Sequence, residues 1–235
     1  MTTGVLCLHG FSGAPYEVQP FADYIAAHTE WLVAVPTLPG HGETLSMKGY
    51  TAKHWVKAAE LAYLQLAKQV DDVIVVGFSM GGLLAMHLVK IFKVKKLVLL
   101  SAALQYVSPA QLLKDLRDML VLLRQRKLRS DELFLRYQRK IRHVPLRATL
   151  EFTKVVAAVK PFYQTIHIPT FIVQGAQDGI VPVATATLLY ETISATEKEL
   201  YISPNGKHHI CYSDDCRQWF STVLTFLQKT PLSEH

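Results

Sequence analysis

The sequence predicts an α/β fold in which a mostly parallel sheet of about six or seven strands is covered by helices on both faces. The first observation is a series of continuous apolar runs, which are typical of strands buried on both faces. The second is that helical stretches of crossover length separate most of these runs. With 50% hydrophobic residues among 235, the chain can bury a sizeable core. The six runs are 5–8, 32–35, 73–76, 96–100, 170–173 and 199–202.

The turn after the first run is made of small residues that let a backbone N–H group face a site. Residues 9–13 read His-Gly-Phe-Ser-Gly. We predict that the N–H of Phe11 is one donor of an oxyanion hole. His9 precedes the turn and is poorly placed to reach a nucleophile, so we expect His9 to be structural and not catalytic.

The third run leads directly into a G-x-S-x-G box at 77–81, which a helix-forming stretch follows. A strand, a serine between glycines and then a helix is the context of a nucleophile elbow. Ser79 is therefore the candidate nucleophile, and the N–H of Met80 is the predicted second oxyanion donor. The alternative is a glycine-rich turn with an idle serine, because such short matches also arise by accident.

The fourth and fifth runs are separated by roughly seventy residues, far more than an ordinary crossover needs. We predict a helical lid inserted at 104–159, on a core formed by residues 1–103 and 160–235. Such an insertion would lie over the C-terminal edge of the sheet, where open α/β proteins bind ligands.

The net charge of +6 is concentrated in this insertion. Segment 114–147 holds eleven Lys or Arg against four acids, so the remainder of the chain is close to neutral. Apolar residues recur at helical spacing over 112–123, as an amphipathic helix with a solvated charged face requires. We therefore predict no nucleic-acid binding. Weak attraction of an anionic substrate or surface is the alternative.

The fifth run ends in a loop that carries an acid, Asp178. An acid at the end of a late strand is placed to accept a hydrogen bond from a histidine and fix its tautomer. Asp178 is the predicted orienter of the base. The alternative role is to cap the helix that begins near Val183.

The sixth run is followed by two adjacent histidines, His208 and His209. The side chains of neighbouring residues diverge, so only one of them can point at Ser79. We favour His208 as the general base and leave His209 as the alternative. A metal cluster of both histidines with Cys211 and Cys216 is disfavoured, because the thiol spacing fits no common zinc pattern.

Composition narrows the protein class further. No apolar stretch approaches the roughly 20 residues needed to cross a bilayer, and the first strand begins too early for a signal peptide to precede it. We expect a cytoplasmic protein. Its three cysteines, Cys7, Cys211 and Cys216, form no disulfide framework. The sequence does not indicate an oligomeric state.

With these residues placed, the chain resembles the serine hydrolases of the α/β-hydrolase family, particularly small bacterial carboxylesterases and the monoacylglycerol-lipase-like group. Nearly the whole chain takes part in the resemblance. The family implies the chain order serine, aspartate, histidine and a helical lid at the position of the insertion. The matching segments are 8–13, 38–42, 77–82, 174–178 and 206–208.

The expected activity is hydrolysis of small-molecule esters with short- to medium-chain acyl groups, through an acyl-enzyme and without a metal or organic cofactor. Phe11, Met80 and Val181 are the predicted lining of the acyl pocket. Thioesterases, amidases and carbon–carbon bond hydrolases use the same triad. A ligand-binding protein on the hydrolase scaffold and a membrane-surface protein are alternatives from other classes.

Overall fold

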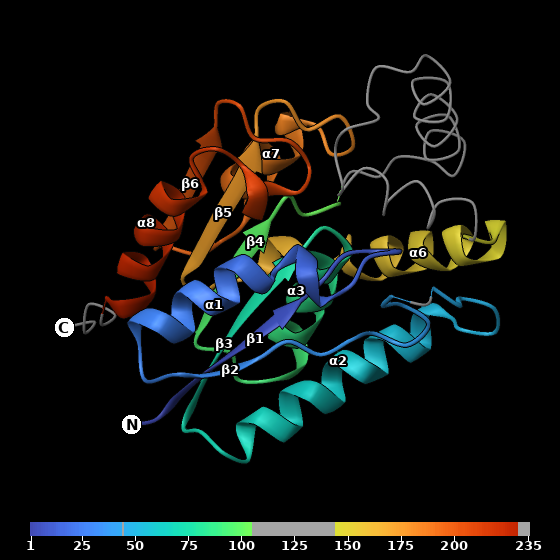
Figure 1. Ribbon diagram of the computed structural model, residues 1–235, viewed down its shortest axis with the longest axis horizontal. Coiled ribbons are helices and arrows are strands. Elements are labelled where there is room, and N and C mark those ends of the chain that lie inside the picture. The colour runs from blue at the N-terminus through green and yellow to red at the C-terminus, as the bar shows by residue number, and fades with distance from the viewer. Residues whose placement is uncertain (44, 105–143, 230–235) are drawn as a thin grey trace.

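Six parallel strands form one sheet in the computed structural model (Figure 1). The structure describes residues 1–43, 45–104 and 144–229. The strand order in this part of the chain is β2-β1-β3-β4-β5-β6, so β3 and β4 lie at the centre and β2 and β6 at the edges. The strands are β1 (Thr3–Leu8), β2 (Leu32–Ala34), β3 (Asp72–Phe78), β4 (Lys96–Leu100), β5 (Thr170–Gly175) and β6 (Lys198–Ser203).

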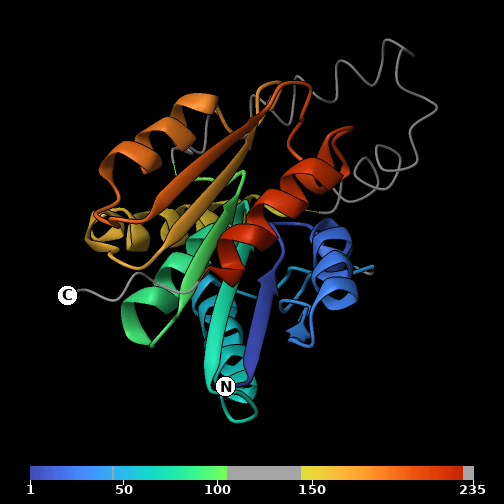
Figure 2. The same ribbon diagram turned by 90° about the vertical axis from the view of Figure 1, so that its left-hand side faces the viewer.

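Helices cover both faces of the sheet (Figure 2). Helices α1 (Gln19–His28) and α8 (Cys216–Gln228) pack on one face. The other face carries α2 (Ala52–Ala67), α3 (Met80–Ile91), α6 (Leu146–Val159) and α7 (Val183–Thr192). None of the described helices combines the length and hydropathy needed to span a bilayer. Three short 3₁₀ helices complete the described part: η1 (Pro15–Glu17), η2 (Tyr163–Thr165) and η3 (Ile210–Tyr212).

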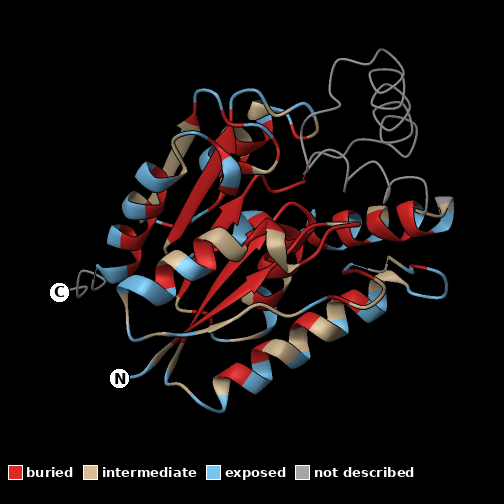
Figure 3. Cartoon of the chain, viewed as in Figure 1, coloured by how far each residue is buried: buried red, intermediate tan, exposed pale blue. Residues whose placement is uncertain are grey.

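Strand β3 shows why the sequence pattern was a continuous apolar run. Its side chains alternate between the two faces. Val73 and Val75 join the hydrophobic cluster with α2 and α3, whereas Ile74, Val76 and Phe78 join the cluster with α1 and α8. Because both faces are covered, neither set can be polar, and the central strands are buried almost throughout (Figure 3).

The predicted fold class is confirmed. All six apolar runs form parallel strands, although the second strand ends one residue earlier than its predicted run. The predicted insertion at 104–159 follows β4, and residues 105–143 of it, including the predicted amphipathic helix at 112–123, lie outside the described residues. Its last part forms α6, which packs against α2 and α3 in the core. The domain boundaries stay a prediction.

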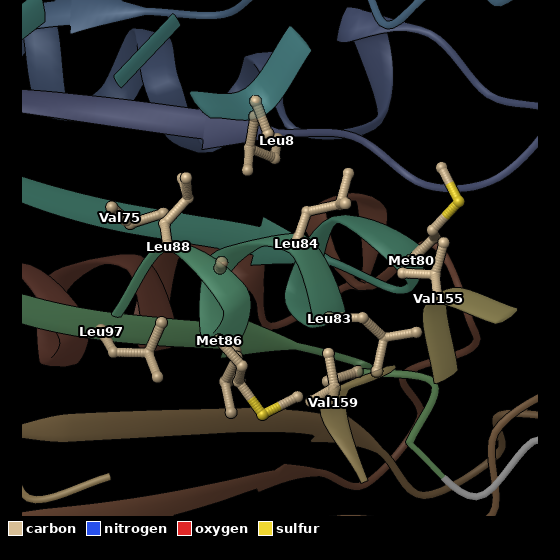
Figure 4. Close-up of a cluster of buried hydrophobic side chains, with 14 of the residues drawn as sticks. Leu8, Val75, Met80, Leu83, Leu84, Met86, Leu88, Leu97, Val155 and Val159 are labelled. Carbon is tan, nitrogen blue, oxygen red and sulfur yellow. The ribbon is translucent and has the colours of Figure 1, made fainter. Parts of the chain in front are cut away.

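Helix α3 contacts the end of β1 through its backbone at its N-terminus. Its apolar side chains lie between those of the strands and those of α6 (Figure 4). At Gly81 the contact involves backbone, because a Cβ atom there would lie 2.7 Å from the carbonyl oxygen of His9 and still closer to that of Leu8. The first turn of α3 can therefore rest on the end of β1 only when residue 81 has no side chain.

Replacing Gly81 by Ala is expected to lower the free energy of unfolding by about 2 kcal/mol or more, because helix and strand must separate to admit the methyl group. Urea denaturation measures this change. The control is Gly179→Ala, since a Cβ at Gly179 meets nothing within 4 Å. That change should alter stability by no more than about 1 kcal/mol. Equal stability of the two variants would contradict the tight contact.

Candidate active site

Three loops that follow strands bring a serine, a histidine and an aspartate together at the C-terminal edge of the sheet. Ser79 follows β3, Asp178 follows β5 and His208 follows β6. His208 lies between the other two: its Nε2 is 3.2 Å from Ser79 Oγ, and its Nδ1 is 2.9 Å from Asp178 Oδ2. The three predicted residues thus form one hydrogen-bonded chain, although 129 positions separate Ser79 from His208.

Ser79 occupies a strained turn between β3 and α3. Its backbone has φ 53° and ψ −114°, which a residue with a side chain rarely adopts. Hydrogen bonds hold the turn in this conformation: Ser79 N–H donates to Leu100 O at 2.9 Å, and Ser79 O accepts from the amides of Gly82 and Ala103. The strain presents the hydroxyl at the tip of the turn, beside the N-terminus of α3.

The contacts of His208 define its tautomer. An ionised carboxylate can only accept hydrogen bonds, so the proton lies on Nδ1 and points at Asp178. Nε2 is then left with a lone pair that accepts the hydroxyl hydrogen of Ser79. The imidazole also packs against the ring of Phe78 with centroids 5.0 Å apart, which restricts its rotation. The lone pair of His208 Nε2 therefore faces the hydroxyl group of Ser79.

Asp178 is buried and held by several donors. Its Oδ1 accepts from the amides of Ile180 and Val181, and its Oδ2 accepts from Gln174 Nε2 at 2.9 Å. Burial raises the pKa of Asp178, but the charge and hydrogen bond of His208 and the two amides outweigh it, so the pKa lies below its ordinary value. The carboxylate of Asp178 is therefore ionised beside His208 Nδ1.

The alternative role of Asp178 as a helix cap does not agree with these contacts. The N-cap of α7 is Pro182, and no side chain caps that helix. The carboxylate bonds instead to amides that precede the helix, within its own loop. Asp178 therefore organises the loop after β5 and faces His208.

The two adjacent histidines point to different partners. His208 contacts Ser79, whereas His209 Nε2 lies 3.3 Å from Oε1 of the buried Glu17. The divergence expected for neighbouring side chains thus directs His208 toward Ser79. Within the described residues, no three His, Cys, Asp or Glu side chains are grouped as a metal site requires.

The turn after β1 begins against the first turn of α3, as the close approach of His9 O to Gly81 shows. His9 is fully buried and bonded through both ring nitrogens: Nε2 accepts from Leu38 N–H at 3.0 Å and Nδ1 donates to Gly10 O. These contacts fit the structural role expected of it. Phe11, Met80 and Val181, the predicted pocket residues, all belong to or pack against the same hydrophobic cluster.

Two buried polar residues at this edge of the sheet were not singled out by the sequence interpretation. Gln174 donates to both Asp178 Oδ2 and Val181 O, and Glu17 accepts from Gly10 and contacts His209. Gln174 lies within a matching motif, 174–178, which was the available signal. Glu17 lies in no motif, and its only signal in the sequence was its position shortly after the turn of residues 9–13.

This sheet, with a serine at a strand-to-helix turn and a histidine and an aspartate beside it, defines the class of α/β hydrolases. Residues 2–215 match the family model Hydrolase_4, described as Serine aminopeptidase, S33, and the chain belongs to that family. The resemblance seen in the sequence is thereby confirmed.

Curated relatives align over nearly the whole chain. The thermostable monoacylglycerol lipase of Bacillus sp. (strain H-257) is 29% identical over 231 residues, which cover 96% of this chain and 90% of that protein. The carboxylesterase of Bacillus subtilis (strain 168) is 22% identical over 227 residues, covering 96% and 92%. The solved structure reported for LipS and LipT, two metagenome-derived lipolytic enzymes, superimposes with a TM-score of 0.77 at 24% identity, covering 97% and 94%. This last likeness concerns the fold.

The loop that carries His208 is closed by Asp215, which precedes α8. Its two carboxylate oxygens accept from Ser203 Oγ at 2.6 Å and from Tyr201 OH at 3.0 Å, both on β6. Burial raises the pKa of Asp215, but hydrogen bonds from Ser203, Ser213 and Tyr201 outweigh this effect, so the pKa lies below its ordinary value. The ionised carboxylate therefore ties the two ends of the loop together.

Replacing Asp215 by Asn is expected to make the fold less sensitive to acid. Because the pKa is lowered on folding, the ionised carboxylate contributes stability that is fully present above the ordinary pKa and is lost as the pH falls through the folded-state value. The free energy of unfolding, measured with urea at about pH 6 and about pH 3, should fall more in the wild type than in Asp215→Asn. Asp214→Asn removes the exposed neighbouring carboxylate and should follow the wild type. An equal fall in all three proteins would contradict this account.

Proposed function

We propose that this protein is a carboxylesterase that hydrolyses short- to medium-chain esters through an acyl-enzyme, with Ser79 as nucleophile, His208 as base and Asp178 as its orienter. The observation that carries the proposal is the position of His208, whose two ring nitrogens lie within hydrogen-bonding distance of Ser79 and Asp178. An activated serine needs this arrangement, and an idle serine in a glycine-rich turn has no use for it.

In the proposed reaction, Ser79 Oγ attacks the ester carbonyl carbon while His208 Nε2 takes the hydroxyl proton. The amides of Phe11 and Met80 hold the oxyanion of the tetrahedral intermediate, each donor contributing on the order of 3 kcal/mol. The proton on Nε2 then passes to the leaving alcohol, and water repeats the cycle on the acyl-enzyme. Met80 begins α3, so its amide also lies at the positive end of a helix dipole. This chemistry requires neither a metal nor an organic cofactor.

Esters are the preferred substrates in this proposal because the curated relatives with whole-chain alignments are described as a lipase and a carboxylesterase. The matched family is described as an aminopeptidase, which makes an amide the informative comparison substrate. Phe11, Met80 and Val181 are proposed to line the acyl pocket, which is consistent with their place in one apolar cluster.

The insertion at 104–159, on a core of residues 1–103 and 160–235, is proposed to contribute to substrate choice. Phe152, from the described end of this segment, stacks on Phe11 with ring centroids 5.2 Å apart and an interplanar angle of 27°. A residue of the insertion thus touches a proposed oxyanion residue.

The proposed attraction of anionic surfaces concerns segment 114–147, nearly all of which lies outside the described residues.

Replacing Ser79 by Ala is expected to lower kcat for p-nitrophenyl butyrate by about 10⁴-fold or more, because no other group can form the acyl-enzyme. Labelling by a fluorophosphonate should be lost as well, while the thermal unfolding temperature stays close to that of the wild type. The control is Ser221→Ala, on the exposed face of α8, which should keep full activity. Turnover by Ser79→Ala at the wild-type rate would contradict the proposed nucleophile.

An amide substrate tests the proposed preference for esters. If the wild type hydrolyses an amino-acyl p-nitroanilide faster than the ester, the protein is a peptidase.

The two histidines are expected to differ sharply when each is replaced by Gln. His208→Gln leaves Ser79 without a proton acceptor and should lower kcat by about 10⁴-fold. The loss in His209→Gln should be smaller by at least about two powers of ten, because His209 faces Glu17 and not Ser79. Steady-state kinetics with one ester measure kcat for both variants. Equal losses, or a larger loss in His209→Gln, would exclude His208 as the base.

A further inference from the structure

The carboxylate of Glu17 lies between the two loops that the proposed mechanism uses. Glu17 ends η1, directly after the turn of residues 9–13, and only 2% of its surface is exposed. The proposed mechanism gives this buried acid no role. Buried carboxylates are rare unless partners compensate the lost hydration, so the partners of Glu17 indicate what it does.

The first partner is the turn that carries Phe11. Glu17 Oε2 accepts from Gly10 N–H at 2.9 Å. The turn also wraps closely around the carboxylate, because a Cβ atom at Gly13 would overlap the Glu17 carboxyl group and one at Gly10 would lie 3.2 Å from Oε2. Phe11 lies between these two contacts. The position of its amide is therefore set by the position of the carboxylate.

The second partner is His209, which follows the proposed base. Its Nε2 lies 3.3 Å from Glu17 Oε1. The rings of His208 and His209 both pack against Phe78, with centroids 5.0 and 5.8 Å away. One carboxylate thus connects the loop that holds the proposed oxyanion donor to the loop that holds the proposed base.

The ionised state of Glu17 fits this arrangement. Burial raises its pKa, but the hydrogen bond and charge of His209 and the amide of Gly10 outweigh burial, so the pKa lies below its ordinary value. A carboxylate forms stronger hydrogen bonds than a neutral acceptor does, which suits a group that must fix two segments at once.

We propose that Glu17 is a positioning residue, whose carboxylate holds the turn of residues 9–13 and the loop of His208 at the separation that places the Phe11 amide on the oxyanion. This inference rests on the proposed function. An oxyanion donor acts on the transition state and contributes little to the bound ester, so displacement of the turn should reduce kcat and leave KM nearly unchanged. A residue that only stabilised the fold would give no such division.

Three substitutions separate positioning from folding. Glu17→Gln keeps the shape of the side chain and both hydrogen bonds. The carbonyl oxygen of the glutamine accepts from Gly10 N–H, and its amide group donates to His209 Nε2 when that nitrogen carries no proton. Glu17→Met has similar length but removes both bonds. Glu17→Asp keeps the charge and is one methylene shorter, so it cannot reach both loops. The control is Glu60→Met, which breaks a Glu–His pair between α2 and α3, where Glu60 Oε1 lies 3.1 Å from His87 Nε2.

Glu17→Met should lower kcat for p-nitrophenyl butyrate by about 100-fold, the effect of losing one oxyanion donor, with KM within about threefold of the wild type. Glu17→Gln should keep kcat within about tenfold, and Glu60→Met should be unaffected. A trifluoromethyl ketone gives a second measurement. Ser79 Oγ bonds to its carbonyl carbon, the hydroxyl proton passes to His208 Nε2, and the ketone oxygen becomes the oxyanion. Its inhibition constant should rise in Glu17→Met by about the factor that kcat loses.

Every outcome bears on the proposal. Glu17→Met with wild-type kcat and inhibition constant would overturn it, as would a loss confined to KM. If Glu17→Met does not fold, Glu17→Asp decides: a kcat reduced at least about tenfold at constant KM supports positioning, and an unchanged kcat overturns it. An active wild type with inactive Ser79→Ala and fully active Glu17 variants would reject only this inference. A wild type that neither hydrolyses esters nor reacts with a fluorophosphonate would reject the proposed function, and the inference with it.

Discussion

Helix α3 can rest on the end of β1 only because Gly81 has no side chain, and this contact joins the helix that follows Ser79 to the strand that leads into the turn of residues 9–13. Ser79 precedes this tightly packed turn of helix and has a strained backbone. The contact also brings the start of the turn of residues 9–13 against the first turn of α3. A single packing constraint therefore places both the hydroxyl and the proposed oxyanion donors.

Two buried carboxylates at this edge of the sheet have the same kinds of partner. Asp178 and Glu17 each face a histidine and each accept from backbone amides of a loop. The amides and the imidazole replace the water that burial removes, which is why both acids have lowered pKa values in spite of burial. Each carboxylate is hydrogen-bonded to a loop that has no regular structure of its own.

Much of this arrangement was predictable from local sequence. The strands appear as apolar runs because both sheet faces are covered, and Ser79 and Asp178 stand in short motifs directly after their strands. Local sequence could not settle the choice between His208 and His209 in the same way, because the residue that His209 contacts is Glu17, 192 positions away. The packing of α6 against α2 and α3 was equally hidden, since an apolar helical stripe fits a lid and a core helix alike.

The order of the strands explains why the histidine loop needs external anchors. Strand β6 lies three positions from β3, or about 14 Å at a strand spacing of about 4.8 Å. The loop after β6 must therefore cross the ends of two strands before His208 can reach Ser79. Along this path, Asp215 ties the loop to β6, and the buried Ile210 packs with strand residues in one hydrophobic cluster. Glu17 and the carbonyl oxygen of Tyr16, both in η1, contact the loop from the other side. His208, which comes from the edge of the sheet, stays within hydrogen-bonding range of Ser79 because both ends of its loop are anchored.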